Sequence, residues 1–151
     1  MKLYAISDLH LGYEANQRAL LEIMSHPADW LILAGDVGET AAHLELAFRE
    51  LKPRFAKLVW VPGNHELWTL PGSNETARGR FKYDELVELC RSHGVLTPED
   101  PYPIVTIAGR EVRIAPLFLL SVLPHIVIWS TVDRESTAPP ISQSLSAHPW
   151  R

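Results

Sequence analysis

Three short groups of polar residues carry side chains that could act together on a substrate. They are Asp8-Leu9-His10, Gly35-Asp36 and Gly63-Asn64-His65-Glu66. The interval along the sequence from Asp8 to Asp36 equals the interval from Asp36 to Asn64. A unit of one strand, one helix and two turns takes about 30 residues, which is close to that interval. The spacing therefore predicts that the three groups occupy equivalent points of successive units.

Together these groups would bring two carboxylates, an imidazole and an amide oxygen to one place. Two closely packed carboxylates repel each other, and a divalent cation relieves that repulsion. Mixed nitrogen and oxygen donors suit manganese, iron, zinc or nickel better than calcium. Asp36 stands in the middle and could bridge two ions, and ions about 3.5–4 Å apart are a known arrangement for phosphoryl displacement. Gly35 and Gly63 would allow tight turns and close approach there.

The elements that must position these groups alternate between strand and helix. We expect strands at residues 2–7, 30–34 and 57–61, helices at 14–25, 40–51 and 81–92, and a hairpin at 104–115. This alternation is typical of an α/β fold with a parallel sheet. The carboxyl ends of its strands meet at one edge, where open α/β folds bind ligands. In an extended backbone, the side chains of Asp8 and His10 would share a face.

Length, charge and hydropathy bear on the number of domains and on the kinds of partner that the protein could bind. With 151 residues, 46% of them hydrophobic, the chain suits one globular domain. A net charge of −4 does not indicate a nucleic-acid partner, although it leaves a local basic patch open. The longest apolar stretch, residues 114–129, is interrupted and shorter than the roughly 20 residues of a membrane helix, so no membrane partner is expected.

The N-terminus and the cysteine content point to the cytoplasm. The apolar run that begins the chain is too short for the core of a signal peptide. Cys90 is the one cysteine of the sequence, so the chain has no internal disulfide, which fits a reducing compartment. We therefore expect a cytoplasmic location.

The three motifs, in this order and at this spacing, resemble those of the calcineurin-like metallophosphoesterases. That family's pattern is Asp-x-His, then Gly-Asp, then Gly-Asn-His-Asp/Glu, each at the end of a strand. The likeness covers about residues 1–120, which we take as the N-terminal portion of the family's domain. It implies an α/β metallophosphatase-like sandwich of β-sheets flanked by helices. It also implies hydrolysis of phosphomonoesters or phosphodiesters by a metal-activated water, with a small-molecule phosphoester as substrate.

The same resemblance implies the roles of individual residues. Asp8 and His10 would bind one of two divalent ions, Asn64 would bind the other, and Asp36 would bridge them. His65 would contact the phosphate and act as general acid or transition-state stabiliser.

Three neighbours of the motifs have competing interpretations. Glu66 either takes part in the site or orients its own loop. Glu39 is expected to begin the helix at 40–51 rather than to bind metal, since acids favour a helix N-terminus. Trp68 either packs or lines the substrate pocket.

After Leu120 the chain departs from the family's pattern. The family continues with histidine motifs that complete both metal shells. Here no glycine follows Gly109, and the late histidines His125 and His148 stand in a different context. Residues 121–151 hold six serines and four prolines and are predicted to be a divergent, poorly structured tail. The predicted fold is accordingly incomplete.

Two explanations account for this departure. A frameshift or truncation would leave an authentic N-terminal part, and the abrupt change of composition favours it. The alternative is a natural short variant, whose site a partner chain could complete. The hypotheses are thus a metal-dependent phosphoesterase, a catalytically defective fragment, or a non-catalytic metal-binding or interaction subunit. The sequence leaves the substrate, the metals and the oligomeric state open.

Overall fold

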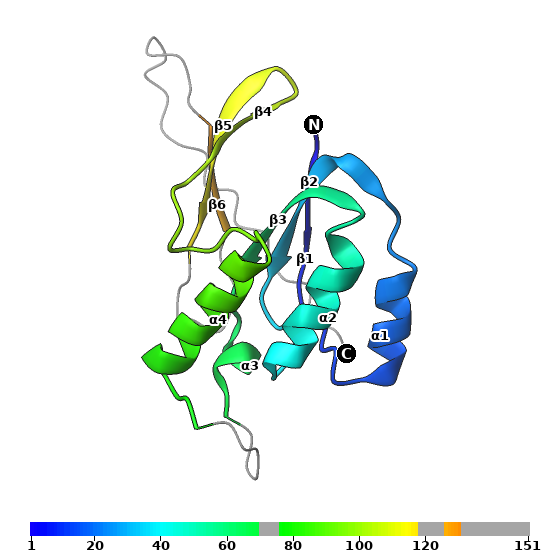
Figure 1. Ribbon diagram of the computed structural model, residues 1–151. Coiled ribbons are helices and arrows are strands. Elements are labelled where there is room, and N and C mark those ends of the chain that lie inside the picture. Colours follow the sequence, from blue (N-terminus) through cyan, green and yellow to red (C-terminus); the bar gives the residue numbers. More distant parts are fainter. Residues whose placement is uncertain (70–75, 118–125, 131–151) are drawn as a thin grey trace, which may run out of the picture.

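The computed structural model describes residues 1–69, 76–117 and 126–130 of the chain. Helices and strands follow one another as shown in Figure 1: β1 (Leu3–Ile6), α1 (Glu14–Leu21), β2 (His26–Ala34), α2 (Ala41–Leu51), β3 (Phe55–Val61), α3 (Asn64–Leu67), α4 (Arg80–Ser92), β4 (Ile104–Ile107), β5 (Arg110–Pro116) and β6 (Ile126–Ser130). None of the helices described is long and apolar enough to cross a bilayer.

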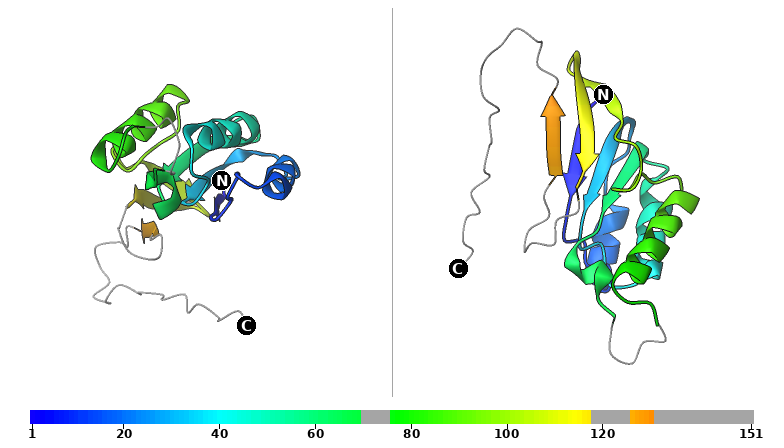
Figure 2. Two further views of the ribbon diagram at one scale, coloured as in Figure 1. Left: turned by 90° about the horizontal axis from the view of Figure 1, so that it is seen from below. Right: turned by 90° about the vertical axis from the view of Figure 1, so that its left-hand side faces the viewer.

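The strands form two sheets of three. β1, β2 and β3 are parallel and lie side by side in that order, whereas β4, β5 and β6 are antiparallel. Crossovers between parallel strands are right-handed, and the strand order runs in one direction, so α1 and α2 lie on the same face of the parallel sheet. α4 covers that face too, and the antiparallel sheet lies on the other (Figure 2). The predicted α/β arrangement of β-sheets flanked by helices is confirmed.

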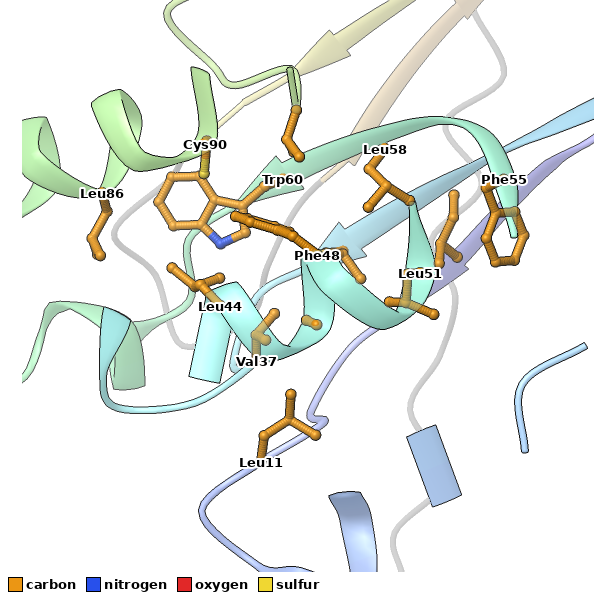
Figure 3. Close-up of a cluster of buried hydrophobic side chains, with 14 of the residues drawn as sticks. Leu11, Val37, Leu44, Phe48, Leu51, Phe55, Leu58, Trp60, Leu86 and Cys90 are labelled. Carbon is orange, nitrogen blue, oxygen red and sulfur yellow. The ribbon is translucent and has the colours of Figure 1, made fainter. Parts of the chain in front are cut away.

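Alternate residues of the parallel strands face two different hydrophobic clusters. Leu33 and Trp60 face the helices, while Ile32 and Val59 pack with Ile114 of β5 between the two sheets. Burial on both faces is the reason for the continuous apolar run in β2. Figure 3 shows Trp60 in the helix-side cluster, surrounded by side chains that include Leu44, Phe48, Leu86 and Cys90.

Several elements differ from those predicted. α1 ends at Leu21 rather than at residue 25, and β2 begins at His26 rather than at residue 30. The early start is held by the His26 amide, which donates to the Arg54 carbonyl at 2.7 Å. The register then shifts between His26 and Trp30, which accommodates Pro27 because proline has no N–H for the ladder. α3 was not predicted, since its four residues are too few to show a helical period.

β4 and β5 form the predicted hairpin. Ile107 pairs with Arg110, so the turn consists of Ala108 and Gly109, whose φ angles are 50° and 78°. Positive φ at both central residues is typical of a type I′ turn, whose twist matches that of the strands. Glycine adopts this conformation without strain, whereas alanine does not.

The predicted division near residue 120, between the phosphoesterase-like portion and the tail, stays a prediction. Ile126–Ser130 form β6, which is antiparallel to β5 in a register that places Ile128 opposite Ile114. Most of the predicted tail, residues 131–151, lies outside the described residues, as do His125 and His148.

Candidate metal centre

The three polar motifs follow the carboxyl ends of β1, β2 and β3, where the spacing placed them (Figure 1). In the sheet, Ile6 is paired with Leu33, and Leu33 is paired with Trp60. The step along the sequence between these paired positions is one shorter than the step between successive motifs. Relative to these paired positions, each successive motif therefore lies one residue further along the chain.

The loop after β1 is fastened along the loop after β2. The amides of Asp8, His10 and Leu11 donate to the carbonyls of residues 35, 36 and 37 at 3.1, 2.9 and 2.8 Å. Such a run of hydrogen bonds satisfies backbone groups that have left the strand ladder. It also sets how far the Asp8 and His10 side chains stand from Asp36.

Two amide side chains of α1 support the same loop. Asn16 Nδ2 donates to the Leu9 carbonyl at 2.8 Å, and Gln17 Nε2 donates to the Leu11 carbonyl at 2.6 Å. Sequence reasoning missed both residues. The available signal was the position of Asn16, four residues before Leu20, which places it on the face of α1 that is turned inward.

The backbone at three predicted ligands is left-handed. The φ angles are 57° at Asp8, 43° at His10 and 53° at Asp36. The expectation of an extended Asp8–His10 segment is therefore wrong, because hydrogen bonding to the second loop curves the chain. His10 Nε2 nevertheless lies 3.9 Å from Asp8 Oδ1. Such conformations cost about 1–3 kcal/mol each and cluster at functional sites.

Two glycines allow the loops after β2 and β3 to touch. A Cβ atom at Gly63 would lie 2.1 Å from Asp36 Oδ1, and one at Gly35 would lie 2.9 Å from the Gly63 Cα. Real Cβ contacts are never this short, so any side chain would push the loops apart. The predicted close approach at Gly35 and Gly63 is confirmed.

Asp36 lies at the centre of the group. Its Oδ1 accepts a hydrogen bond from the His65 amide at 3.1 Å. Ligand atoms of His10, Asp36 and His65 all lie within 4.8 Å of one another. This set of two imidazoles and one carboxylate fits a borderline transition metal. His65 was predicted to be catalytic, and its ring is also close enough to share a cation.

Asp8 and Asn64 lie at the margin of this group. The Asp8 side chain is 64% exposed, and Asp8 is outside the group formed by His10, Asp36 and His65. Asn64 is exposed at the first position of α3. The roles of both as metal ligands stay predictions.

Glu66 connects the loop after β2 to the loop after β3. Its side chain is buried, and its carboxylate accepts hydrogen bonds from the amides of Asp36 (3.1 Å), Val37 (2.7 Å) and Gly63 (2.9 Å). Burial raises the pKa of Glu66, while the backbone donors oppose that rise. Of the two interpretations of Glu66, the structure supports the one in which it orients the loops.

Glu39 has a role that sequence reasoning missed. Its Oε1 lies 3.2 Å from His65 Nδ1, and its Oε2 lies 3.6 Å from His43 Nδ1. Thr40, not Glu39, caps α2, through a hydrogen bond from the His43 amide. A carboxylate closely following Asp36 on the same loop was the available signal. With Nδ1–H donated to Glu39, the Nε2 atom of His65 is the nitrogen left for chemistry.

The other sides of the His65 ring are covered by two aromatic side chains. The ring centre of Trp68 lies 4.0 Å from that of His65, and the ring centre of His10 lies 4.6 Å from it. Trp68 is 49% exposed, so it forms an outer wall of the site.

A buried lysine ties α4 to the loops on both sides of His65. Lys82 is 3% exposed, and its ammonium donates to the carbonyls of Trp68 and Glu39. Carbonyl acceptors compensate for the loss of hydration of the charge. Lys82 thereby holds together the segments that carry the Glu39 carboxylate and the Trp68 ring.

Comparisons with known proteins agree with this geometry. The sequence model of the calcineurin-like phosphoesterase family matches residues 1–141. The chain is 47% identical over 119 residues to the [acyl-carrier-protein] phosphodiesterase PptH of Mycobacterium tuberculosis, a match that covers 78% of this chain and 37% of that protein.

A solved structure of the phosphopantetheinyl hydrolase from Mycobacterium tuberculosis is similar in fold. The TM-score is 0.73 at 47% identity, over 78% of this chain and 42% of that one. The chain therefore spans well under half the length of these relatives. On the family match and this identity, the chain belongs to the calcineurin-like phosphoesterase family.

Proposed function

We propose that this chain carries part of the active site of a metal-dependent phosphodiesterase, which cleaves the phosphodiester between phosphopantetheine and an acyl carrier protein. The observation that carries the proposal is the convergence of His10, Asp36 and His65 within 4.8 Å, at the edge of the sheet where the family motifs end. Support for this substrate comes from the two similar proteins, an acyl-carrier-protein phosphodiesterase and a phosphopantetheinyl hydrolase.

The proposed cations are two divalent ions from the group of manganese, iron, zinc and nickel. Asp8, His10, Asp36 and Asn64 would hold them, with Asp36 between the two. The Oδ1 atom of Asp36 accepts from the His65 amide, and its Oδ2 has no hydrogen-bond partner within the part of the chain that is described. When bound, the ions would activate a water and screen the charge of the phosphate.

His65 is the proposed general acid. Its Nδ1 faces the Glu39 carboxylate at 3.2 Å, which leaves Nε2 as the nitrogen that would donate a proton. From Nε2 the proton would pass to the oxygen that leaves phosphorus. Trp68 and His10 limit the movement of the ring and hold it in one orientation.

A second candidate is a metal-binding chain without turnover. The observation that favours it is the number of converging donors: the described residues bring one group of three together. Two transition-metal ions require more ligands than that.

The test compares metal binding with turnover. We would measure Mn²⁺ and Zn²⁺ binding by calorimetry, and hydrolysis of bis(4-nitrophenyl) phosphate and of phosphopantetheinylated acyl carrier protein, for the wild type and Asp36→Asn. Asparagine keeps an acceptor for the His65 amide but removes the charge. The matched control is Asp29→Asn, in a residue that bonds the Lys2 amide at 2.6 Å and lies away from the centre.

Each outcome decides between the candidates. The phosphodiesterase proposal is supported if hydrolysis depends on metal, is lost in Asp36→Asn and is kept in Asp29→Asn. Metal binding that depends on Asp36, with no hydrolysis of either substrate, supports the second candidate. No metal binding by the wild type contradicts both.

A further inference from the structure

A cavity beside the metal centre has no part in the chemistry proposed so far. Its volume is about 680 Å³, and residues that line it include Leu67, Arg80, Tyr83, Pro98, Glu99 and Tyr102. Sites for small organic molecules typically measure about 300–1,000 Å³. The cavity is therefore large enough for a substrate group, not merely for water.

Leu67 connects this cavity to the metal centre. It is the last residue of α3, the single turn that begins at Asn64 and also carries His65. Residues three apart on a helix have Cβ atoms about 5–6 Å apart. Leu67, which lines the cavity, is therefore a neighbour of Asn64 on the surface of α3. The first turn of α4, with Arg80 and Tyr83, forms another wall.

The walls combine apolar surface with a few polar groups of both signs. The Tyr83 hydroxyl donates to Glu99 Oε1 at 3.0 Å, and the Arg80 guanidinium lies 5.5 Å from the centre of the Tyr83 ring. Tyr102 is 38% exposed and presents a further aromatic ring. A carboxylate can accept from amide N–H groups, a guanidinium can donate to amide carbonyls, and aromatic rings pack against short apolar segments.

We propose that this cavity binds the pantetheine arm of the substrate, an inference that rests on the proposed function. Pantetheine is a neutral, extended chain with two amide groups, and the phosphate attached to one end would lie at the metal centre. The Glu99 carboxylate disfavours a second anion in the cavity, and the Arg80 guanidinium is already partly engaged, because its Nε donates to Asp84 Oδ1 at 2.7 Å. A neutral amide chain therefore fits this cavity better than a phosphate or a nucleotide does.

The experiment measures binding without turnover, so that it does not depend on catalysis. Calorimetry with pantetheine, which lacks the phosphate, is carried out on the full 151-residue chain. Tyr102→Ala and Leu67→Ala remove lining groups. Phe81→Ala is the matched control, since Phe81 is on the same turn of α4 but is 79% exposed and outside the lining set. Thermal melts followed by circular dichroism verify that each variant is folded.

The expected result is a Kd for pantetheine that rises roughly tenfold in Tyr102→Ala, equivalent to about 1.4 kcal/mol, and is unchanged in Phe81→Ala. Asp36→Asn should leave pantetheine binding intact. If hydrolysis fails while pantetheine binds in this pattern, the proposed function is lost but the cavity assignment stands. No binding by the wild type at millimolar pantetheine, as when another part of the chain fills the cavity, overturns the assignment. Equal affinity in folded Tyr102→Ala and Leu67→Ala also overturns it.

Discussion

Glu66 illustrates how one buried residue can hold together the loops of the candidate metal centre. Its two carboxylate oxygens accept from three backbone amides in two loops, and its side chain is 1% exposed. The left-handed φ of 53° at Asp36 persists because such contacts determine the loop. At this scale, a substitution that preserves shape but changes hydrogen-bonding capacity is the sharpest test.

We predict that Glu66→Gln lowers the free energy of unfolding by about 1–3 kcal/mol, because the new NH₂ group would face a backbone donor and leave it unpaired. Urea denaturation at neutral pH measures the change. Glu88→Gln serves as the control, since its side chain is 72% exposed, and a change within about 0.5 kcal/mol is expected. Equal losses in both variants would contradict the role assigned to Glu66.

At the scale of elements, the β4–β5 hairpin contains a residue that does not suit its turn. Ala108 has a φ of 50°, a conformation that asparagine and glycine adopt more readily than alanine. Pairing of the two strands offsets the unfavourable conformation of Ala108, since the hairpin keeps a regular antiparallel register from Ile104–Arg113 to Ile107–Arg110. The strain is therefore local and removable.

Ala108→Asn should raise the free energy of unfolding by about 1 kcal/mol, because Asn-Gly is the favoured pair in a type I′ turn. Ala108→Val is the opposed variant and should destabilise the protein, since a β-branched side chain clashes at positive φ. Both are measured by thermal and chemical denaturation. A loss of stability in Ala108→Asn would show that the turn is not strained as described.

α4 is attached to the loops of the metal centre by Lys82, whose ammonium donates to the Glu39 carbonyl at 3.3 Å and to the Trp68 carbonyl. Lys82→Met would keep the apolar stem but leave these carbonyls without their donor, and we expect a loss of about 1–3 kcal/mol. Lys52→Met, at the exposed end of α2, is the control. Thermal melts would compare the two variants, and Lys82→Met should have the lower melting temperature. Identical melting temperatures would contradict the proposal that Lys82 stabilises the contact between α4 and these loops.

At the scale of the whole molecule, helices and the second sheet bury opposite faces of one parallel sheet. Cys90 of α4 is 0% exposed within the helix-side cluster, next to Trp60 in Figure 3. Burial raises the pKa of this thiol well above its ordinary range. A raised pKa keeps the thiol protonated at pH values where a free cysteine is already partly thiolate.

Cys90 should therefore not react with a disulfide reagent such as Ellman's reagent at pH 8 while the protein is folded. It should react at once in 6 M guanidinium chloride, where the thiol is exposed and its pKa returns to about 8.5. In intermediate denaturant the rate should follow the unfolding curve recorded by circular dichroism. Fast reaction without denaturant would mean that α4 opens separately from the sheets.

The sequence alone determined the order of the strands β1 to β5 and of the longer helices α1, α2 and α4, as well as the fold class and the place of the three motifs. The physical reason is that these depend on local patterns: apolar runs make strands, helical periods make amphipathic helices, and an even spacing returns each motif to the same edge. Family motifs then indicated the chemistry of Asp8, His10, Asp36, Asn64 and His65.

The tertiary structure decided which side chains meet. The left-handed turns at Asp8 and His10, the contact of Glu39 with His65, and the bonds from the Asp36 and Val37 amides to Glu66 arise between segments about 30 residues apart in the chain. No local period encodes such contacts, because they depend on how closely two loops approach. That approach is set by the absence of a side chain at Gly35 and Gly63, a fact that acquires its meaning only once the strands lie side by side.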